Sequence, residues 1–196
     1  MTSEQPAIVL MHGYGSNEHD LVPIAEMLAP DLEVLSLRAP IELPWGGAAW
    51  FQLLDENEDA RLAEIDVAVA GAWEKIDARF GSDRKVVAIG FSQGGLMASQ
   101  LLRTRPERVA ATVIFAGIVS PAQYPADALL AEQKPEIFYG KGDEDQLLEN
   151  IRWFPGTISK LESIAQVDKH FYPGLAHQLN EQEIADARAY LQRMLS

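Results

Sequence analysis

One serine stands between two glycines in the segment 90–94, whose sequence is GFSQG. The apolar, partly β-branched run 85–89 before it predicts a buried strand, and the apolar residues after it recur at helical spacing. A strand that turns into a helix within a few residues strains the residue at the turn and brings backbone close to its neighbours, which must therefore be small. The pattern predicts a nucleophile elbow, G-x-S-x-G, that presents Ser92 as a nucleophile. The alternative is an ordinary glycine-rich turn.

A serine hydroxyl needs a histidine base, and the histidine needs an acid that fixes its tautomer. In this architecture the acid and then the base follow the serine along the chain. Of the four histidines, His170 and His177 come after Ser92. His170 belongs to a strand-like run, whereas His177 lies on a loop between a predicted strand and a predicted helix, where scaffolds hold catalytic groups. We therefore expect His177 to be the base.

The acid is expected on the loop that follows the strand-like run 136–140. Three carboxylates follow that run, namely Asp143, Glu144 and Asp145. Neighbouring loop positions point in different directions, so their spacing alone leaves the choice among the three open.

The attacked carbonyl develops negative charge, which backbone N–H donors stabilise by about 2.7–4 kcal/mol each. One expected donor is the N–H of Gln93, the residue after the nucleophile, at the positive end of the following helix. The other should lie on the loop after the first apolar strand, 7–11, which places the N–H of Tyr14 there. His12 on the same loop is better placed to brace the loop than to do chemistry.

Six motifs follow one another along nearly the whole chain: LMHGYGSNE at 10–18, RAP at 38–40, GAAWF at 47–51, GFSQGG at 90–95, GDED at 142–145 and GLAH at 174–177. Together they resemble the carboxylesterase and acyl-protein thioesterase family of α/β-hydrolases, also called the phospholipase/carboxylesterase family. The resemblance implies a triad of Ser92, Asp145 and His177, because the second aspartate of the family's G-D-x-D-x-x-V-P motif falls on Asp145. The chain departs from this motif at 146–149, where it reads QLLE.

The resemblance also bears on substrate choice. The loop 40–59 carries Trp50 and Phe51, which by resemblance flank the active site and form one wall of an acyl groove. The alternative is that both rings pin the loop to the core. The expected activity is hydrolysis of a carboxylic ester or thioester through an acyl-enzyme, with no metal or cofactor. A lysophospholipase, or a non-catalytic binding protein with the same fold, is the alternative.

These groups require elements that hold them together, and strands and helices indeed alternate along the chain without a linker. Expected strands cover 7–11, 32–37, 85–89, 109–119, 137–140 and 169–172. The alternation predicts a single α/β-hydrolase domain over 1–196, with a mostly parallel sheet covered by helices on both faces. About fifteen residues separate the strand that ends at Val119 from Pro135, too few for a cap domain.

Helices are expected at 62–80, after the elbow, and around 151–161 with an interruption at Pro155. Two further helices begin at recognisable capping residues. Asp20 is expected to cap the first of these, and Asn180 with Glu183 forms a capping-box-like start to the last.

Composition narrows the function classes. The net charge of −13 argues against a nucleic-acid partner and against stable association with anionic membranes. No signal peptide is visible at the N-terminus, so we expect a cytoplasmic protein. The absence of cysteine excludes disulfides and the cysteine nucleophile of dienelactone-hydrolase-type enzymes. The expected partner is a small acyl ester or an acylated substrate, and the oligomeric state is left open, a homodimer included.

Overall fold

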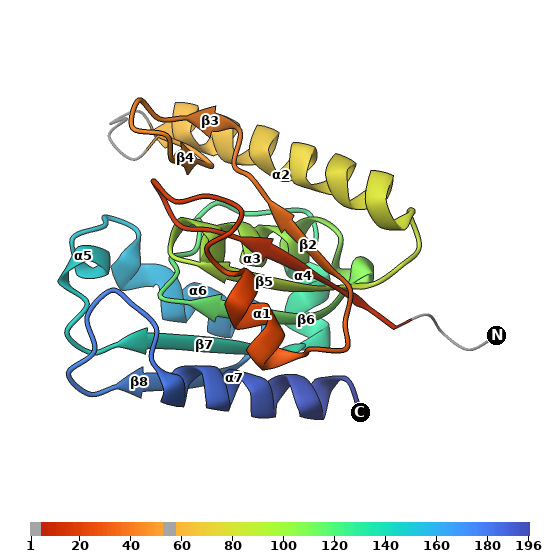
Figure 1. Ribbon diagram of the computed structural model, residues 1–196. Helices are drawn as coiled ribbons and strands as arrows, with labels where there is room; N and C mark the ends of the chain where they lie inside the picture. The colour runs from red at the N-terminus through yellow and green to blue at the C-terminus, as the bar shows by residue number, and fades with distance from the viewer. Residues whose placement is uncertain (1–4, 53–57) are drawn as a thin grey trace.

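The computed structural model describes residues 5–52 and 58–196. Its centre is a six-stranded sheet in the order β2-β1-β5-β6-β7-β8, and all neighbouring strands in it are parallel. The strands are β1 (Ala7–Met11), β2 (Val34–Leu37), β5 (Val86–Phe91), β6 (Val109–Phe115), β7 (Glu136–Gly142) and β8 (Gln166–Tyr172). A separate antiparallel pair, β3 (Ile41–Glu42) and β4 (Ala48–Ala49), lies outside this sheet, on the side of the molecule where α2 is drawn (Figure 1). The expected parallel α/β architecture is confirmed.

Helices cover both faces of this sheet. One hydrophobic core joins the sheet to α2 (Glu58–Phe80), α3 (Gln93–Thr104), α4 (Asp127–Gln133) and α6 (Thr157–Ile164). The other joins it to α1 (Val22–Leu28) and α7 (Glu181–Met194). The long helices α2 and α7 run along opposite sides of the molecule (Figure 1).

Strand residues alternate between these two cores because successive side chains of a strand point to opposite faces. In β1, Val9 and Met11 belong to the first core, whereas Ile8 and Leu10 belong to the second. Buried apolar strands of this kind are typical of parallel sheets covered on both faces. Within the described residues, no helix is both long and apolar enough to cross a lipid bilayer.

The strand expected at 109–119 ends earlier, at Phe115. Ala116 has φ +45°, a left-handed conformation that breaks the strand, and its N–H donates to the carbonyl of Gly140 at 2.7 Å. The described segment between β6 and β7 then holds one short helix, α4, in keeping with the expected absence of a cap domain. The interruption expected at Pro155 is also present, as a 3₁₀ turn over Phe154–Gly156.

The two expected helix caps turned out differently. Leu21 rather than Asp20 occupies the N-cap position of α1, and the Asp20 carboxylate instead accepts a hydrogen bond from the Ser16 hydroxyl at 2.7 Å. Asn180 does cap α7, because its side-chain oxygen accepts from the N–H of Glu183 at 2.8 Å. The reciprocal half of the capping box is missing: the Glu183 side chain turns into the interior instead of bonding back to Asn180.

Candidate active site

Ser92 lies at the turn from β5 into α3. Its φ of +56° and ψ of −116° are strained for a residue with a side chain, and its N–H donates to Phe115 O at 2.8 Å. Two glycines permit the turn. A Cβ placed on Gly90 would lie 1.9 Å from the carbonyl oxygen of Gly94, and one placed on Gly94 would lie 1.8 Å from that of Met11. The backbone therefore has the sharp geometry expected of a nucleophile elbow.

A chain of hydrogen bonds connects the serine to a histidine and a carboxylate. His177 Nε2 lies 2.9 Å from Ser92 Oγ, and His177 Nδ1 lies 2.7 Å from Asp145 Oδ2. The other carboxylate oxygen of Asp145 accepts from the N–H of Leu148 at 2.9 Å, and Asp145 is fully buried. Both oxygens are thus held, which fixes the orientation of the imidazole.

These three residues come from separate turns, after β5, β7 and β8, that meet because the carboxyl ends of parallel strands share one edge of the sheet. Short α5 (Gln146–Glu149) begins directly after Asp145, which is its N-cap. The Phe91 ring packs against the imidazole of His177 at 4.8 Å between ring centroids. A ring contact on one side and a carboxylate on the other leave the imidazole little freedom to rotate.

The other acids and the other histidine considered from the sequence lie away from this chain of hydrogen bonds. Asp143 and Glu144 are exposed, and the carboxylate of Asp143 accepts from the N–H of Gly174 at 2.7 Å. His170 lies on β8, where its Nε2 is 2.9 Å from Asp168 Oδ1. Asp145 and His177 are therefore the pair that the fold brings to Ser92.

The loop that follows β1 lies against the elbow. A Cβ placed on Gly13 would lie 3.2 Å from the Phe91 ring, and Tyr14 and Gln93 line the same cavity as Ser92. Within the described part of the chain, the backbone N–H groups of Tyr14 and Gln93 donate no hydrogen bond. Two N–H groups beside a nucleophile and without a partner can receive an oxyanion.

Polar side chains lock the backbone around these donors. The side chain of Gln93 accepts from the N–H of Trp50 at 2.8 Å and donates to the carbonyl of Phe51 at 2.7 Å. His12 braces the loop after β1: its Nδ1 lies 2.8 Å from Gly13 O, and its Nε2 accepts from Ala39 N–H at 3.2 Å. Burial lowers the pKa of His12, which favours the neutral ring that accepts this bond.

A cavity of about 180 Å³ opens beside Ser92. Its lining is mostly apolar and includes Gly13, Tyr14, Ser16, Asp20, Phe91, Ser92, Gln93, Ile118, Leu147, Leu148, Ile151 and His177. Asp20 is the carboxylate among these residues.

The expectation that Trp50 and Phe51 wall an acyl groove is corrected by the structure. Both side chains are buried in the hydrophobic core, with 2% and 1% of their surface exposed, and neither lines the cavity. The indole N–H of Trp50 also has a partner within the protein, because it donates to His12 O at 2.9 Å. The alternative that these rings pin the loop to the core is the one that holds.

The apolar wall comes instead from the segment that follows Asp145. Leu147, with 57% of its surface exposed, and Ile151 line the cavity, with Ile118 from the loop after β6. The sequence analysis treated residues 146–149 only as a departure from a motif. Two leucines on a loop already expected to border the site were the signal that could have identified this wall.

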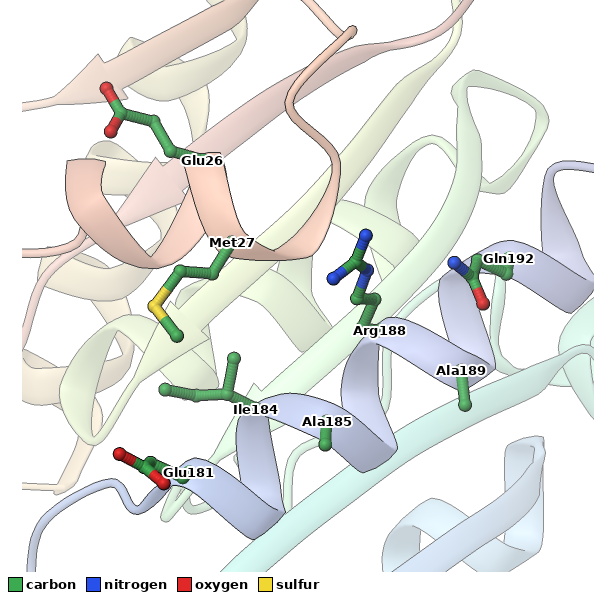
Figure 2. Close-up of a pocket in the computed structure, with 8 residues that line it drawn as sticks. All are labelled: Glu26, Met27, Glu181, Ile184, Ala185, Arg188, Ala189 and Gln192. Atoms are coloured by element: carbon green, nitrogen blue, oxygen red, sulfur yellow. The ribbon is translucent and has the colours of Figure 1, made fainter.

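A larger hollow of about 500 Å³ lies between α1 and α7 (Figure 2). Its eight lining residues are Glu26, Met27, Glu181, Ile184, Ala185, Arg188, Ala189 and Gln192, and they include neither a nucleophile nor a histidine. Elsewhere in residues 5–52 and 58–196, no cluster of three or more histidine, aspartate or glutamate side chains is arranged to hold a metal ion.

Comparison with known proteins gives a consistent picture. A family model described as Phospholipase/Carboxylesterase matches residues 1–195. Acyl-protein thioesterase 1 of Cryptococcus neoformans is 25% identical over 220 residues, covering 96% of this chain and 92% of that protein. The putative hydrolase MhqD of Bacillus subtilis is 25% identical over 195 residues, with 93% of this chain and 90% of that protein covered.

Solved structures are similar over the same length. A Bacillus cereus carboxylesterase superposes with a TM-score of 0.78 at 25% identity, covering 98% of this chain and 90% of that one. Esterase PE8 superposes with a TM-score of 0.77 at 26% identity, covering 98% and 94%.

Proposed function

Since the chain belongs to the phospholipase/carboxylesterase family of ester-bond hydrolases, we propose that it is a serine hydrolase in which Ser92 is the nucleophile, His177 the base and Asp145 the acid. The observation that carries the proposal is the continuous chain of hydrogen bonds from Ser92 Oγ through His177 to buried Asp145. A binding protein that merely kept the fold would have no need of this alignment or of the strained backbone at Ser92.

The geometry supports a two-stage reaction. Ser92 Oγ attacks the carbonyl carbon while its proton passes to His177 Nε2, and Asp145 stabilises the resulting imidazolium. The negative charge on the carbonyl oxygen is received by the N–H groups of Tyr14 and Gln93. Collapse of this intermediate expels the alcohol or thiol, which takes the proton from His177 and leaves an acyl ester on Ser92. Water, deprotonated by His177, then releases the acid and restores the serine.

The cavity supports a substrate class. Its lining of Ile118, Leu147 and Ile151 suits an aliphatic acyl group of limited length, given a volume of about 180 Å³. The exposed position of Leu147 and the short β6–β7 connection leave the mouth open to an ester or thioester carried on a larger partner. Asp20 places a negative charge in the cavity lining, which disfavours the phosphate of a lysophospholipid.

The test measures kcat/KM for p-nitrophenyl esters of increasing chain length, for an acyl-thioester and for a lysophospholipid. We expect ester and thioester turnover without added metal, with the lysophospholipid the poorest substrate. Mass spectrometry after treatment with an organophosphorus reagent should show one adduct, located on Ser92 and absent in Ser92→Ala. A protein that binds acyl esters but forms no adduct and releases no acid would contradict the proposal.

A further inference from the structure

A second carboxyl group lies buried near the proposed triad. Glu183 follows Asn180 in the first turn of α7, where a capping box would point its side chain outward. Instead Glu183 has 0% exposure, and neither of its carboxyl oxygens has a hydrogen-bond partner in the described parts of the chain. A buried carboxylate without a donor is far costlier than a buried neutral acid, so such a group holds its proton.

The position of this carboxyl group is set by β7. A Cβ placed on Gly140 would lie 2.4 Å from Glu183 Oε1, so the glycine makes the room that the side chain occupies. Gly142, two residues further along the strand, faces the same side of the sheet. There a Cβ would lie 1.8 Å from the carbonyl oxygen of Leu175 and 2.7 Å from that of Ala176, on the loop that leads into His177. Glu183 and the loop of His177 therefore occupy adjacent places on one face of β7.

None of the titratable groups that act on Glu183 stabilises its ionised form. They are Asp145 at the start of α5, Asp186 on α7, Tyr139 on β7 and Tyr172 on β8, and none of them is a cation. His170 on β8 pairs with Gly140 in the sheet, but its ring faces two other carboxylates, with Nε2 2.9 Å from Asp168 Oδ1 and Nδ1 3.6 Å from Asp186 Oδ2. Burial and the charges of Asp145 and Asp186 together raise the pKa of Glu183 to about 8.

Two further elements pack on α7. β6 contains no ionisable residue. The ionisable residue of α1, Glu26, lies with Glu181 and Arg188 in the hollow between α1 and α7 (Figure 2). The positive end of the α7 dipole favours a charged Glu183, whereas burial and the neighbouring carboxylates favour the neutral acid.

We propose that Glu183 is a positioning residue for Asp145 and His177: held as a neutral acid it fills the space under Gly140, and its ionisation in alkaline solution expels it from that space and disorders the loop that carries His177. The consequence is a loss of activity at high pH that belongs to Glu183 and not to the reacting groups. This inference rests on the proposed function, since it concerns how that triad is held.

The substitution that tests it is Glu183→Gln, which mimics the neutral acid and cannot ionise. The matched control is Glu181→Gln, the same change in the same helical turn at an exposed position. With a p-nitrophenyl ester, kcat/KM of the natural chain should fall about tenfold between pH 7 and pH 9, as expected for one group with a pKa of about 8. Glu183→Gln should retain its value at pH 7 within about threefold and fall by less than about threefold at pH 9. An identical alkaline fall in both chains would overturn the proposal.

A second measurement needs no turnover. Infrared difference spectra of the natural chain against Glu183→Gln should contain the carbonyl band of a protonated carboxylic acid at pH 7, which disappears on titration to high pH. If esters are not hydrolysed but this band is found, the proposed function fails while the buried acid stands. If the band is missing at pH 7, the inference about Glu183 fails whatever the enzyme hydrolyses.

A third variant covers the case in which Glu183→Gln does not fold. Gly140→Ala retains the glutamate but crowds its carboxyl group, which pushes it toward solvent and eases its ionisation. The alkaline fall in kcat/KM should then begin at lower pH than in the natural chain. An alkaline fall at the same pH in Gly140→Ala would count against the proposal.

Discussion

The side-chain carbonyl of Gln93 accepts a hydrogen bond from the backbone N–H of Trp50 at 2.8 Å, which joins the nucleophile elbow to the segment after β4. The same side chain donates to Phe51 O. One glutamine therefore connects the proposed oxyanion donors to a buried aromatic pair, and the cavity beside Ser92 depends on packing that lies behind it.

Gln93→Ala should lower both stability and activity. It leaves the N–H of Trp50 and the carbonyl of Phe51 buried without partners, at a cost of about 1–3 kcal/mol for each group. Urea unfolding should show the loss in free energy of unfolding, and kcat/KM should fall because the elbow is less firmly held. Gln182→Ala, at an exposed position on α7, is the control; equal stability of the two variants would contradict the role given to Gln93.

Ser92→Ala should lower kcat by roughly 10⁴- to 10⁶-fold, because the hydroxyl is the proposed nucleophile. The melting temperature should be nearly unchanged, since alanine retains the Cβ that the strained backbone at this position already accommodates. Ser99→Ala, a buried serine on the same helix, should leave turnover within a few fold. Turnover of the Ser92 variant at the natural rate would remove this residue from its role.

Asp145→Asn should lower kcat by about 10⁴-fold, because an amide no longer holds His177 in the tautomer that accepts the serine proton. Asp143→Asn changes the same kind of group on the same loop, but its carboxylate accepts from the backbone N–H of Gly174 and not from His177, so its effect should be small. Steady-state kinetics on one activated ester compare the two variants. A larger loss of kcat in Asp143→Asn than in Asp145→Asn would instead assign the acid of the triad to Asp143.

Leu147→Ala should reduce kcat/KM more for an octanoyl ester than for an acetyl ester. Leu147 lines the cavity, and each methylene that loses apolar contact costs about 0.8 kcal/mol, or roughly a fourfold loss. Because the Leu147 side chain is exposed and contributes little to the core, the melting temperature of this variant should be unchanged. Trp50→Ala is the contrasting change: a buried ring is lost, at about 3–5 kcal/mol of stability, with similar losses on both esters.

Stability should depend on pH through Glu183. Burial raises its pKa from 4.5 to about 8, so the folded chain retains a proton that the unfolded chain releases. The stabilisation that this retained proton adds to the free energy of unfolding is therefore fully present below pH 4.5 and is lost as the pH rises toward 8. The pKa of His12 is lowered by burial in the folded chain, so the unfolded chain binds the extra proton. The His12 contribution to the free energy of unfolding therefore increases as the pH rises through about 6.5, which is opposite to the trend for Glu183. Comparing the natural chain with Glu183→Gln cancels the His12 contribution.

The free energy of unfolding of Glu183→Gln, relative to the natural chain, should increase from pH 5 to pH 8 by at most about 1.4 kcal/mol per pH unit. Chemical denaturation at each pH measures it. Glu181→Gln should show no such trend, and a constant difference for Glu183→Gln would mean that Glu183 is ionised in the folded chain as well as in the unfolded chain over this range.

Local pattern predicted most of the scaffold. Runs such as Ile8–Leu10 are apolar on both faces, as a strand buried between two layers must be, and the parallel sheet followed from their alternation with helices. The end of β6 escaped prediction because Ala116 adopts a left-handed turn that its sequence does not signal. Ser92 and His177 were predicted from motif and chain order, whereas Asp145 was predicted only through the resemblance to the family.

Side-chain direction was the part that sequence could not supply. Trp50 and Phe51 were placed on the right loop but on the wrong side of it, because an aromatic residue fits a core as well as a groove. Glu183 had the spacing of a capping residue, and only the space beside Gly140 reveals where its carboxyl group lies. Both outcomes depend on contacts with distant strands, which no local pattern records.

The bond between His177 and Ser92 spans 85 residues of sequence. Between the two lie β6, β7 and β8, so the contact closes a segment that contributes three strands to the sheet. Contacts of such separation form late, because the chain entropy lost in closing them is recovered only when the intervening segments are packed. Regain of esterase activity after dilution from urea should therefore lag behind regain of helical circular dichroism. The rate at which turnover returns then measures the last stage of refolding.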